Sequence, residues 1–147
     1  MSKTIFVNLP VADLDKAKAF YAALGFVNEP KFTDATAAAM QWSEAIVVML
    51  LTHAKWKTFT TRPIPEQGSS EVSLAISLES KAEVDALVET AAANGGTADV
   101  NPPEDHGFMS QRSILDPDGH LWEPVWMDPA IAETGPPEIA ETHARAS

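Results

Sequence analysis

The chain begins with a β-branched and aromatic run that predicts a β-strand over residues 4–9. Successive side chains of a strand point to opposite faces, so one face of this strand carries Phe6 and Asn8. Apolar residues then recur at helical spacing over residues 14–24, and Asp13 stands where a helix N-cap is expected. The pattern therefore predicts one strand followed by one amphipathic helix.

Three further strands are predicted in the first half, over residues 30–33, 37–42 and 46–51. The third is the clearest, because it is a continuous apolar run, whereas the second is rich in alanine. A turn between the last two indicates a hairpin. Residues 53–70 lack periodicity and contain several Pro, Gly and Ser residues, which is typical of a linker.

The second half repeats this order. Residues 71–78 alternate with period two, which predicts a strand with one apolar face. Ser80 and Glu83 form a capping-box pattern at the start of a helix that ends before Gly95. Three more strands are predicted, over residues 97–100, 109–115 and 120–126.

The repeated order predicts an α+β fold made of two tandem βαβββ modules, which form a curved eight-stranded mixed sheet around a cleft. Residues 1–127 would form one domain, with module one at 4–52, the linker at 53–70 and module two at 71–127. A two-layer ferredoxin-like sandwich is the alternative. Residues 128–147 differ in composition and are expected to form a C-terminal tail, which is either disordered or rests on something such as a second subunit.

Composition narrows the function. The net charge of −11 makes a nucleic acid an unexpected partner, and it is compatible with a cationic ligand or simply with solubility. The chain has no cysteine, which excludes disulfides, thiolate metal sites and cysteine nucleophiles. No apolar run is long enough to span a membrane, and the first residues carry no signal-peptide pattern. A cytoplasmic protein with no membrane partner is expected.

The turn at residues 116–119 and the strand after it contain a candidate site residue. Residues 116–119, Asp-Pro-Asp-Gly, are strong turn chemistry between two apolar runs, which predicts a hairpin. In the second strand Glu123 shares a face with Leu121 and Val125, so it is a lone acid among apolar neighbours. It either lies at a solvated edge or pairs with a base, or it lines a pocket.

Two separated motifs resemble the vicinal oxygen chelate superfamily, which includes glyoxalase I, bleomycin-resistance proteins and extradiol dioxygenases. The first is the strand and helix from Phe6 to Phe26, which ends in Phe-Tyr-Ala-Ala-Leu-Gly-Phe, and the second is the hairpin at residues 116–123. The resemblance covers about residues 4–127. It implies paired modules around a cleft, often built as a homodimer. It does not fix the chemistry, because the superfamily hosts isomerases, dioxygenases, antibiotic-modifying enzymes and proteins that only bind.

The resemblance also locates the places where metal-dependent members hold their metal. These places fall here on four residues: Phe6, Met49, Ser73 and Glu123. A phenyl ring cannot bind a metal, a thioether is a poor ligand for a hard or borderline ion, and a serine hydroxyl is weak. The four histidines show no ligand spacing on one element. We therefore expect no metal at this site and no cofactor.

The inward face should instead form an apolar cleft with a few polar groups, which is usual for a small-molecule site. Glu123 is the candidate general acid or base, or it is simply hydrogen-bonded to Ser73 or Asn8. Gln111 shares a face with Ser113, but the pattern leaves open whether that face looks inward. The candidate ligand-binding residues are Phe6, Asn8, Trp42, Met49, Ser73, His106 and Gln111. Trp42 is alternatively a core residue, and His106 is alternatively an ordinary loop residue.

Three functions remain open. The first is a metal-free protein that binds a small hydrophobic or cationic molecule. The second is a lyase, isomerase or dioxygenase that uses Glu123 as acid or base; glyoxalase I chemistry is not expected, because it needs a metal. The third is a structural dimer whose cleft has lost its role. The missing ligand types and the acidic balance favour the first.

Overall fold

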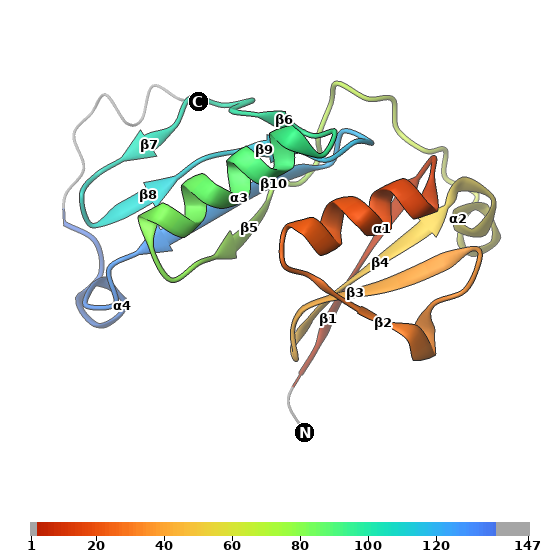
Figure 1. The fold of residues 1–147 in the computed structure, drawn as a ribbon, viewed down its shortest axis with the longest axis horizontal. Helices are drawn as coiled ribbons and strands as arrows, with labels where there is room; N and C mark the ends of the chain where they lie inside the picture. The colour runs from red at the N-terminus through yellow and green to blue at the C-terminus, as the bar shows by residue number, and fades with distance from the viewer. Residues whose placement is uncertain (1–2, 138–147) are drawn as a thin grey trace.

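The computed structural model describes residues 3–137 and shows two modules, each with a helix lying over its sheet (Figure 1). The first module contains β1 (Ile5–Val11), α1 (Leu14–Ala23), β2 (Val27–Glu29), the 3₁₀ helix η1 (Pro30–Phe32), β3 (Ala37–Ser43) and β4 (Ile46–Thr52). The helix α2 (His53–Phe59) follows it. The second module contains β5 (Leu74–Ser77), α3 (Lys81–Ala93), β6 (Thr97–Ala98), β7 (Glu104–Asp105), β8 (Met109–Gln111), β9 (Ile114–Leu115) and β10 (Leu121–Met127), and the short α4 (Ile131–Thr134) follows.

The strands form two separate sheets. The first has the order β1-β4-β3-β2, with β1 and β4 parallel and the other pairs antiparallel. In the second, β10 lies between β5 on one side and β8 and β9 on the other, and β6 and β7 extend it. The second module has five strands after α3, so it does not repeat the expected βαβββ order exactly. The α+β class is confirmed. The single eight-stranded sheet is not, because residues 3–137 contain ten strands in two sheets.

Local chemistry explains the helix starts. The Asp13 carboxylate accepts a hydrogen bond from the backbone N–H of Lys16 at 3.1 Å, as expected for an N-cap. The Ser80 hydroxyl accepts from the backbone N–H of Glu83 at 3.1 Å. The return bond of a capping box is displaced by one residue, since the Glu83 carboxylate lies 3.5 Å from the backbone nitrogen of Glu79.

Several element boundaries differ from the sequence expectation. The strand expected at residues 30–33 is the 3₁₀ helix η1, because Pro30 occupies its first turn and Glu29 caps it; the paired strand β2 lies just before. The linker at 53–70 begins with α2, which Thr52 caps. The loop after β6 contains the short strand β7, which pairs with β8.

The strand expected at residues 109–115 is interrupted between β8 and β9, and Pro124 explains why. Arg112 donates its backbone N–H to the carbonyl of Pro124 at 3.2 Å, but a proline has no N–H to return. The ladder therefore breaks opposite this residue. Of the expected tail at 128–147, residues 131–134 form α4, and residues 138–147 lie outside the described part of the chain.

The two modules share one apolar core. Buried residues of α1 and α3, of β1, β3 and β4, and of β9 and β10 belong to a single cluster. The turn between α3 and β6 lies close to α1 and β9 at Gly96, where a Cβ would lie 2.8 Å from the Phe20 ring and 2.6 Å from the Leu115 carbonyl oxygen. Only glycine leaves room for this approach.

A buried polar group joins the modules within this core. The Tyr21 hydroxyl on α1 donates to Asp116 Oδ2 at 2.5 Å and accepts from Trp122 Nε1 at 3.0 Å. Asp116 Oδ1 accepts from the backbone N–H groups of Asp118 and His120, so this carboxylate also fixes the turn between β9 and β10. Burial raises the pKa of Asp116, and hydrogen bonds to its charged form offset part of that effect.

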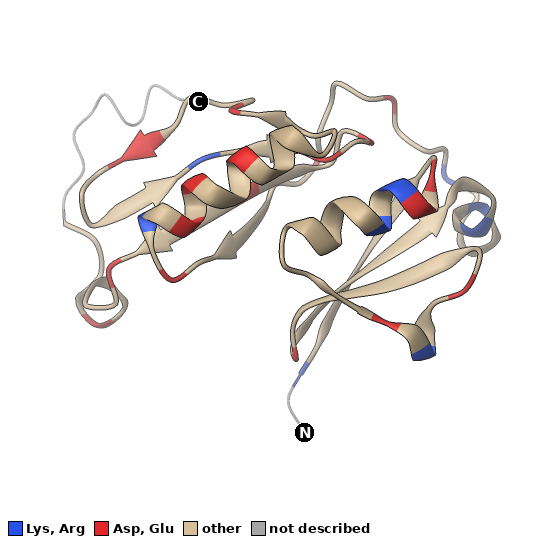
Figure 2. Ribbon diagram, in the orientation of Figure 1, with Lys and Arg blue, Asp and Glu red and all other residues tan. Residues whose placement is uncertain are grey.

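Charge is divided unevenly between the halves. Residues 1–72 carry seven Lys and Arg and seven Asp and Glu, whereas residues 73–147 carry three and fourteen. In Figure 2 the basic residues gather on α1, α2 and η1, and acidic residues line α3. Among residues 3–137, no helix is long and apolar enough to cross a membrane.

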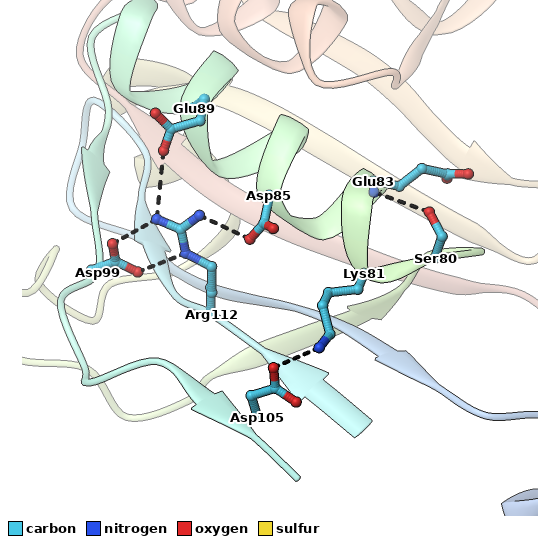
Figure 3. A network of polar contacts seen from close by, with 8 residues as sticks. All are labelled: Ser80, Lys81, Glu83, Asp85, Glu89, Asp99, Asp105 and Arg112. Atoms are coloured by element: carbon cyan, nitrogen blue, oxygen red, sulfur yellow. Dashed lines mark hydrogen bonds and ion pairs between the residues drawn. The ribbon is translucent and has the colours of Figure 1, made fainter. Parts of the chain in front are cut away.

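Arg112 holds α3 against the second sheet (Figure 3). Its guanidinium makes two hydrogen bonds to Asp99, at 2.7 and 3.0 Å, and reaches Asp85 at 3.1 Å and Glu89 at 3.5 Å. The hydrogen bonds from Arg112 lower the pKa of Asp99. Only 17% of the Arg112 side chain is exposed, so this cation is better shielded from solvent than an ordinary surface ion pair.

We predict that Tyr21→Phe lowers the free energy of unfolding by about 3 kcal/mol at neutral pH, because it leaves Asp116 Oδ2 and the Trp122 indole N–H without a partner inside the core. The raised pKa means that the folded state binds the Asp116 proton more tightly, so unfolding becomes easier as pH rises from the ordinary aspartate range through the folded pKa. Tyr21→Phe removes a hydrogen bond to the charged form of Asp116, which raises the folded-state pKa of Asp116 further.

The effect of Tyr21→Phe should therefore be smaller near pH 4 than at pH 7 in urea unfolding curves. Ser43→Ala, which removes an exposed hydroxyl that accepts one backbone bond, is the control and should show no such pH dependence. An effect of Tyr21→Phe that is equal at both pH values would contradict a role for the Asp116 charge.

We also predict that Arg112→Gln destabilises the protein by about 1 kcal/mol, because three carboxylates lose their shared cation. High salt should reduce this loss, since it screens the repulsion that remains. Lys81→Gln is the matched control, because the Lys81–Asp105 pair lies at the surface and its removal should leave the unfolding midpoint unchanged. Equal effects of the two substitutions would be evidence against the network.

Candidate functional site

The helix-free face of the first sheet carries the predicted residues of the first module. In the parallel pair of β1 and β4, Phe6 lies opposite Val47 and Asn8 lies opposite Met49. The alternate residues of both strands, such as Leu9 and Val48, belong to the core under α1. Phe6, Asn8 and Met49 therefore share the face that no helix of this module covers. Phe6 is 60% exposed there.

The helix-free face of the second sheet carries the predicted acid. Glu123 lies in β10 directly opposite Ala75 of β5. Ser73 and Gln111 are its diagonal neighbours on the flanking segments, and both donate side-chain hydrogen bonds to its carboxylate, Ser73 to Oε1 and Gln111 Nε2 to Oε2. We call these three residues the Glu123 cluster.

The Glu123 cluster settles two alternatives that the sequence left open. Of the two expected partners of Glu123, Ser73 is the one observed, whereas Asn8 lies on the other sheet. Gln111 shares the face of Glu123, while the neighbouring Arg112 side chain turns to the opposite side and meets α3. The sequence could not decide this, because alternation shows which residues of a strand share a face but not which of the two faces lies under the helix.

Two predicted residues lie elsewhere. Trp42 packs against Phe26, with ring centroids 4.9 Å apart, and against the core, which is the alternative that the sequence left open. His106 lies in the turn between β7 and β8, where its ring stacks on Phe108 and its Nε2 is 3.1 Å from Glu104 Oε1. The structure thus brings neither residue to Glu123.

The residues at the expected metal places do not fit a divalent metal ion. Phe6 and Met49 lie on the first sheet, and neither supplies a strong ligand. Both oxygens of Glu123 already accept bonds from protein donors. Within residues 3–137, no group of three or more His, Asp or Glu side chains is arranged to hold a metal.

A cavity of about 890 Å³ lies at one end of these faces, which is a usual size for a small-molecule site. Its lining includes Asn8 and Leu51 of the first module, Leu121 of the second, and much of α2 and the following segment. Glu123, Met49 and Ser73 are not among its lining residues. Asn8 and Leu121 stand two positions along their strands from Phe6 and Glu123, which is about 7 Å.

The sequence did not assign a site to the segment that closes this cavity. Its polar and proline-rich composition indicated only a linker. The one signal was the presence of Trp56 and Phe59, two aromatic rings in an otherwise polar stretch, and both line the cavity.

Solved structures with the same fold are numerous. Hypothetical protein SA1046 from S. aureus is 26% identical, with a TM-score of 0.72, over 86% of this chain and 95% of that one. A glyoxalase/bleomycin resistance protein/dioxygenase family enzyme from Burkholderia phytofirmans is 18% identical, with a TM-score of 0.71, over 86% and 99%. The fosfomycin resistance protein FosX from Listeria monocytogenes is 18% identical, with a TM-score of 0.63, over 97% and 98%.

Among curated protein sequences, none matches this chain. The family model of the Glyoxalase/Bleomycin resistance protein/Dioxygenase superfamily matches residues 5–123, which is most of the chain and spans both modules. The resemblance expected from the strand and helix motif and from the hairpin is thereby confirmed. The chain belongs to the glyoxalase/bleomycin resistance protein/dioxygenase superfamily.

Proposed function

We propose that this protein binds a small cationic or hydrophobic molecule on its helix-free faces, without a divalent metal. The observation that carries the proposal is the Glu123 cluster, in which two neutral donors orient one carboxylate on an otherwise largely apolar strand face. A carboxylate held in this way is a fixed negative charge, which suits recognition of a cation.

The surroundings of Glu123 support a cationic ligand. The second half of the chain carries fourteen acidic and three basic residues, so its field attracts positive charge. Phe6, on the first sheet, presents an exposed aromatic ring, and such rings attract cations to their faces. An apolar body with a positive charge matches both features.

A homodimer is part of the proposal. Phe6 and the Glu123 cluster lie on separate sheets, and neither face is covered by a helix of its own module. Ile5, Phe6 and Val72 are 57%, 60% and 60% exposed, and they lie on or beside the edge strands β1 and β5. A second copy that covers these residues would bury apolar surface and bring the two faces together around one ligand.

Acid–base catalysis is the second candidate. Glu123 is half-buried and held at both oxygens, which is the positioning that a general acid or base requires. A lyase, isomerase or dioxygenase would then use this carboxylate. Glyoxalase I activity is not part of the proposal, because the residues at the metal places do not fit the metal that it requires.

We predict that benzyltrimethylammonium, a cationic aromatic probe, binds the wild-type protein and stabilises it in thermal-shift measurements. Glu123→Gln should weaken binding about tenfold by calorimetry, because it removes the charge and keeps the shape. Glu133→Gln changes an exposed acid of the same half and is the matched control, so it should bind as the wild type does.

An absence of binding, or equal affinity of Glu123→Gln and the wild type for the probe, would contradict the proposal that Glu123 binds a cation. Stoichiometric zinc, nickel or iron after metal-free purification would overturn its metal-free part. Turnover of the glutathione hemithioacetal with added nickel or zinc would replace binding with glyoxalase chemistry.

We predict that the protein sediments as a dimer at micromolar concentration and that Phe6→Lys shifts it toward monomer. The control is Phe32→Lys, because Phe32 is 69% exposed on η1, next to β2 at the other edge of the same sheet. A charge at an apolar interface is strongly unfavourable, whereas a charge on a free surface is not. A monomeric wild type, or dissociation by both variants alike, would rule out this dimer.

A further inference from the structure

The cavity of about 890 Å³ and the Glu123 cluster meet along two segments of the second module. We call the cavity the linker cavity, because α2 and residues 60–72 form much of its wall. The rest of the wall comes from β1, from the end of β4 and from the turn that leads into β10. A cavity of this size accommodates an aromatic ring together with an alkyl chain.

The strand β10 leads from the linker cavity to Glu123. Leu121, the first residue of β10, lines the cavity, and Glu123 follows two positions later. Side chains two positions apart in a strand point to the same face and stand about 7 Å from each other. The intervening Trp122 points the other way and is only 2% exposed. The apolar wall at Leu121 therefore continues along the strand face that bears the carboxylate.

The segment before β5 makes a second connection. Glu71 and Val72 line the linker cavity, and the next residue, Ser73, donates a hydrogen bond to Glu123 Oε1. The last part of the cavity wall is thus tied to the carboxylate itself. Because two separate segments bring lining residues up to Glu123, the Glu123 cluster stands at the edge of the cavity, and one ligand can reach both.

The wall at Leu121 is held against the first module. Asp118 Oδ1 accepts from the backbone N–H of Ala12 at 2.9 Å, and His120 Nε2 lies 2.8 Å from the carbonyl oxygen of Pro10. These bonds fix the turn before β10 against the end of β1. A ligand that extends past Leu121 therefore meets a preformed surface, and little of its binding free energy is lost in ordering the protein.

The lining of the linker cavity is mainly apolar and contains more acids than bases. Alkyl and aromatic side chains from both modules contribute to it: Leu51, Trp56, Phe59, Ile64, Val72 and Leu121. Its charged groups are the carboxylates of Glu66, Glu71 and Asp118 and the guanidinium of Arg62. This balance favours a positive ligand over a negative one, which is also the preference expected at Glu123.

We propose that the ligand of Glu123 is an elongated cation, whose charge lies at the Glu123 cluster and whose apolar arm extends past Leu121 into the linker cavity. This inference rests on the proposed function, because it needs a cation at Glu123, and it adds the length and chemistry of the rest of the ligand. An arm of about five single bonds between the charge and a ring spans about 6–7 Å, which matches the spacing of Glu123 and Leu121.

The test compares two probes with the same charged group, benzyltrimethylammonium and (4-phenylbutyl)trimethylammonium, by calorimetry on the full chain. The longer probe should bind about tenfold more tightly, because its ring and additional methylene groups leave water inside the cavity. The anion 5-phenylpentanoate, which has a similar length, should bind at least tenfold more weakly than the longer cation. In methyl NMR spectra the signal of Ile64, identified with Ile64→Ala, should shift with the longer probe, while that of Ile131 on α4 stays in place.

Substitutions separate the arm from the charge. Leu121→Ala and Ile64→Ala, on different walls of the cavity, should each weaken binding of the longer probe about fivefold and change that of benzyltrimethylammonium less than twofold. Glu123→Gln should weaken binding of both probes about tenfold. Val27→Ala shortens an exposed apolar residue of β2 outside the cavity and is the matched control, so it should change neither affinity.

The outcomes distinguish this inference from the proposed function. If benzyltrimethylammonium binds at Glu123 but the longer probe binds no more tightly, or if its gain survives both cavity substitutions, the inference is wrong and the proposed function stands. A preference for 5-phenylpentanoate, or equal affinity of Glu123→Gln and the wild type for the longer probe, would also overturn the inference. If neither cation binds, the proposed function fails and the inference fails with it.

Discussion

The Tyr21 hydroxyl is the point at which the two modules become one structure. It donates to Asp116 on the second module and accepts from Trp122 of β10, inside a core that excludes water. Without this hydroxyl, Asp116 Oδ2 and the Trp122 indole N–H would each lose their hydrogen-bond partner. Asp116 also accepts from the backbone N–H groups of Asp118 and His120, so one carboxylate joins α1 to the turn from which the strand bearing Glu123 begins.

This junction explains where the helix-free faces lie. The core joins the modules on their helix sides, with α1 and α3 both on the side that faces the viewer in Figure 1. Except at the end where α2 and the following segment lie, the helix-free faces are left to solvent, to a ligand or to a second copy of the chain. This arrangement places Glu123 on a helix-free face. Side chains alternate along β10, so Trp122 points into the core and Glu123 points to the other face.

Much of this arrangement follows from side-chain periodicity, which is a local property. Alternation placed Phe6, Asn8 and Met49 on one face, and Ser80 was correctly expected to cap α3. The expectations that the structure did not confirm depend on contacts between residues that are far apart in the sequence. The local sequence of residues 109–115 predicts a continuous strand, but Pro124 on the neighbouring β10 interrupts its pairing. The two sheets remain separate because the modules meet through helices and a turn. The cavity beside α2 was not predicted, because the polar composition of residues 53–70 does not show which residues this segment contacts.

The chemistry of Glu123 follows from what surrounds it. A metal ligand needs several further donors at bonding distance, and the corresponding places hold a phenyl ring, a thioether and a hydroxyl. That hydroxyl, on Ser73, already donates to the carboxylate, as does the amide of Gln111. These bonds hold the negative charge in one orientation, while the acidic second half repels anions from it. The ligand proposed at Glu123 is therefore a cation rather than an anion.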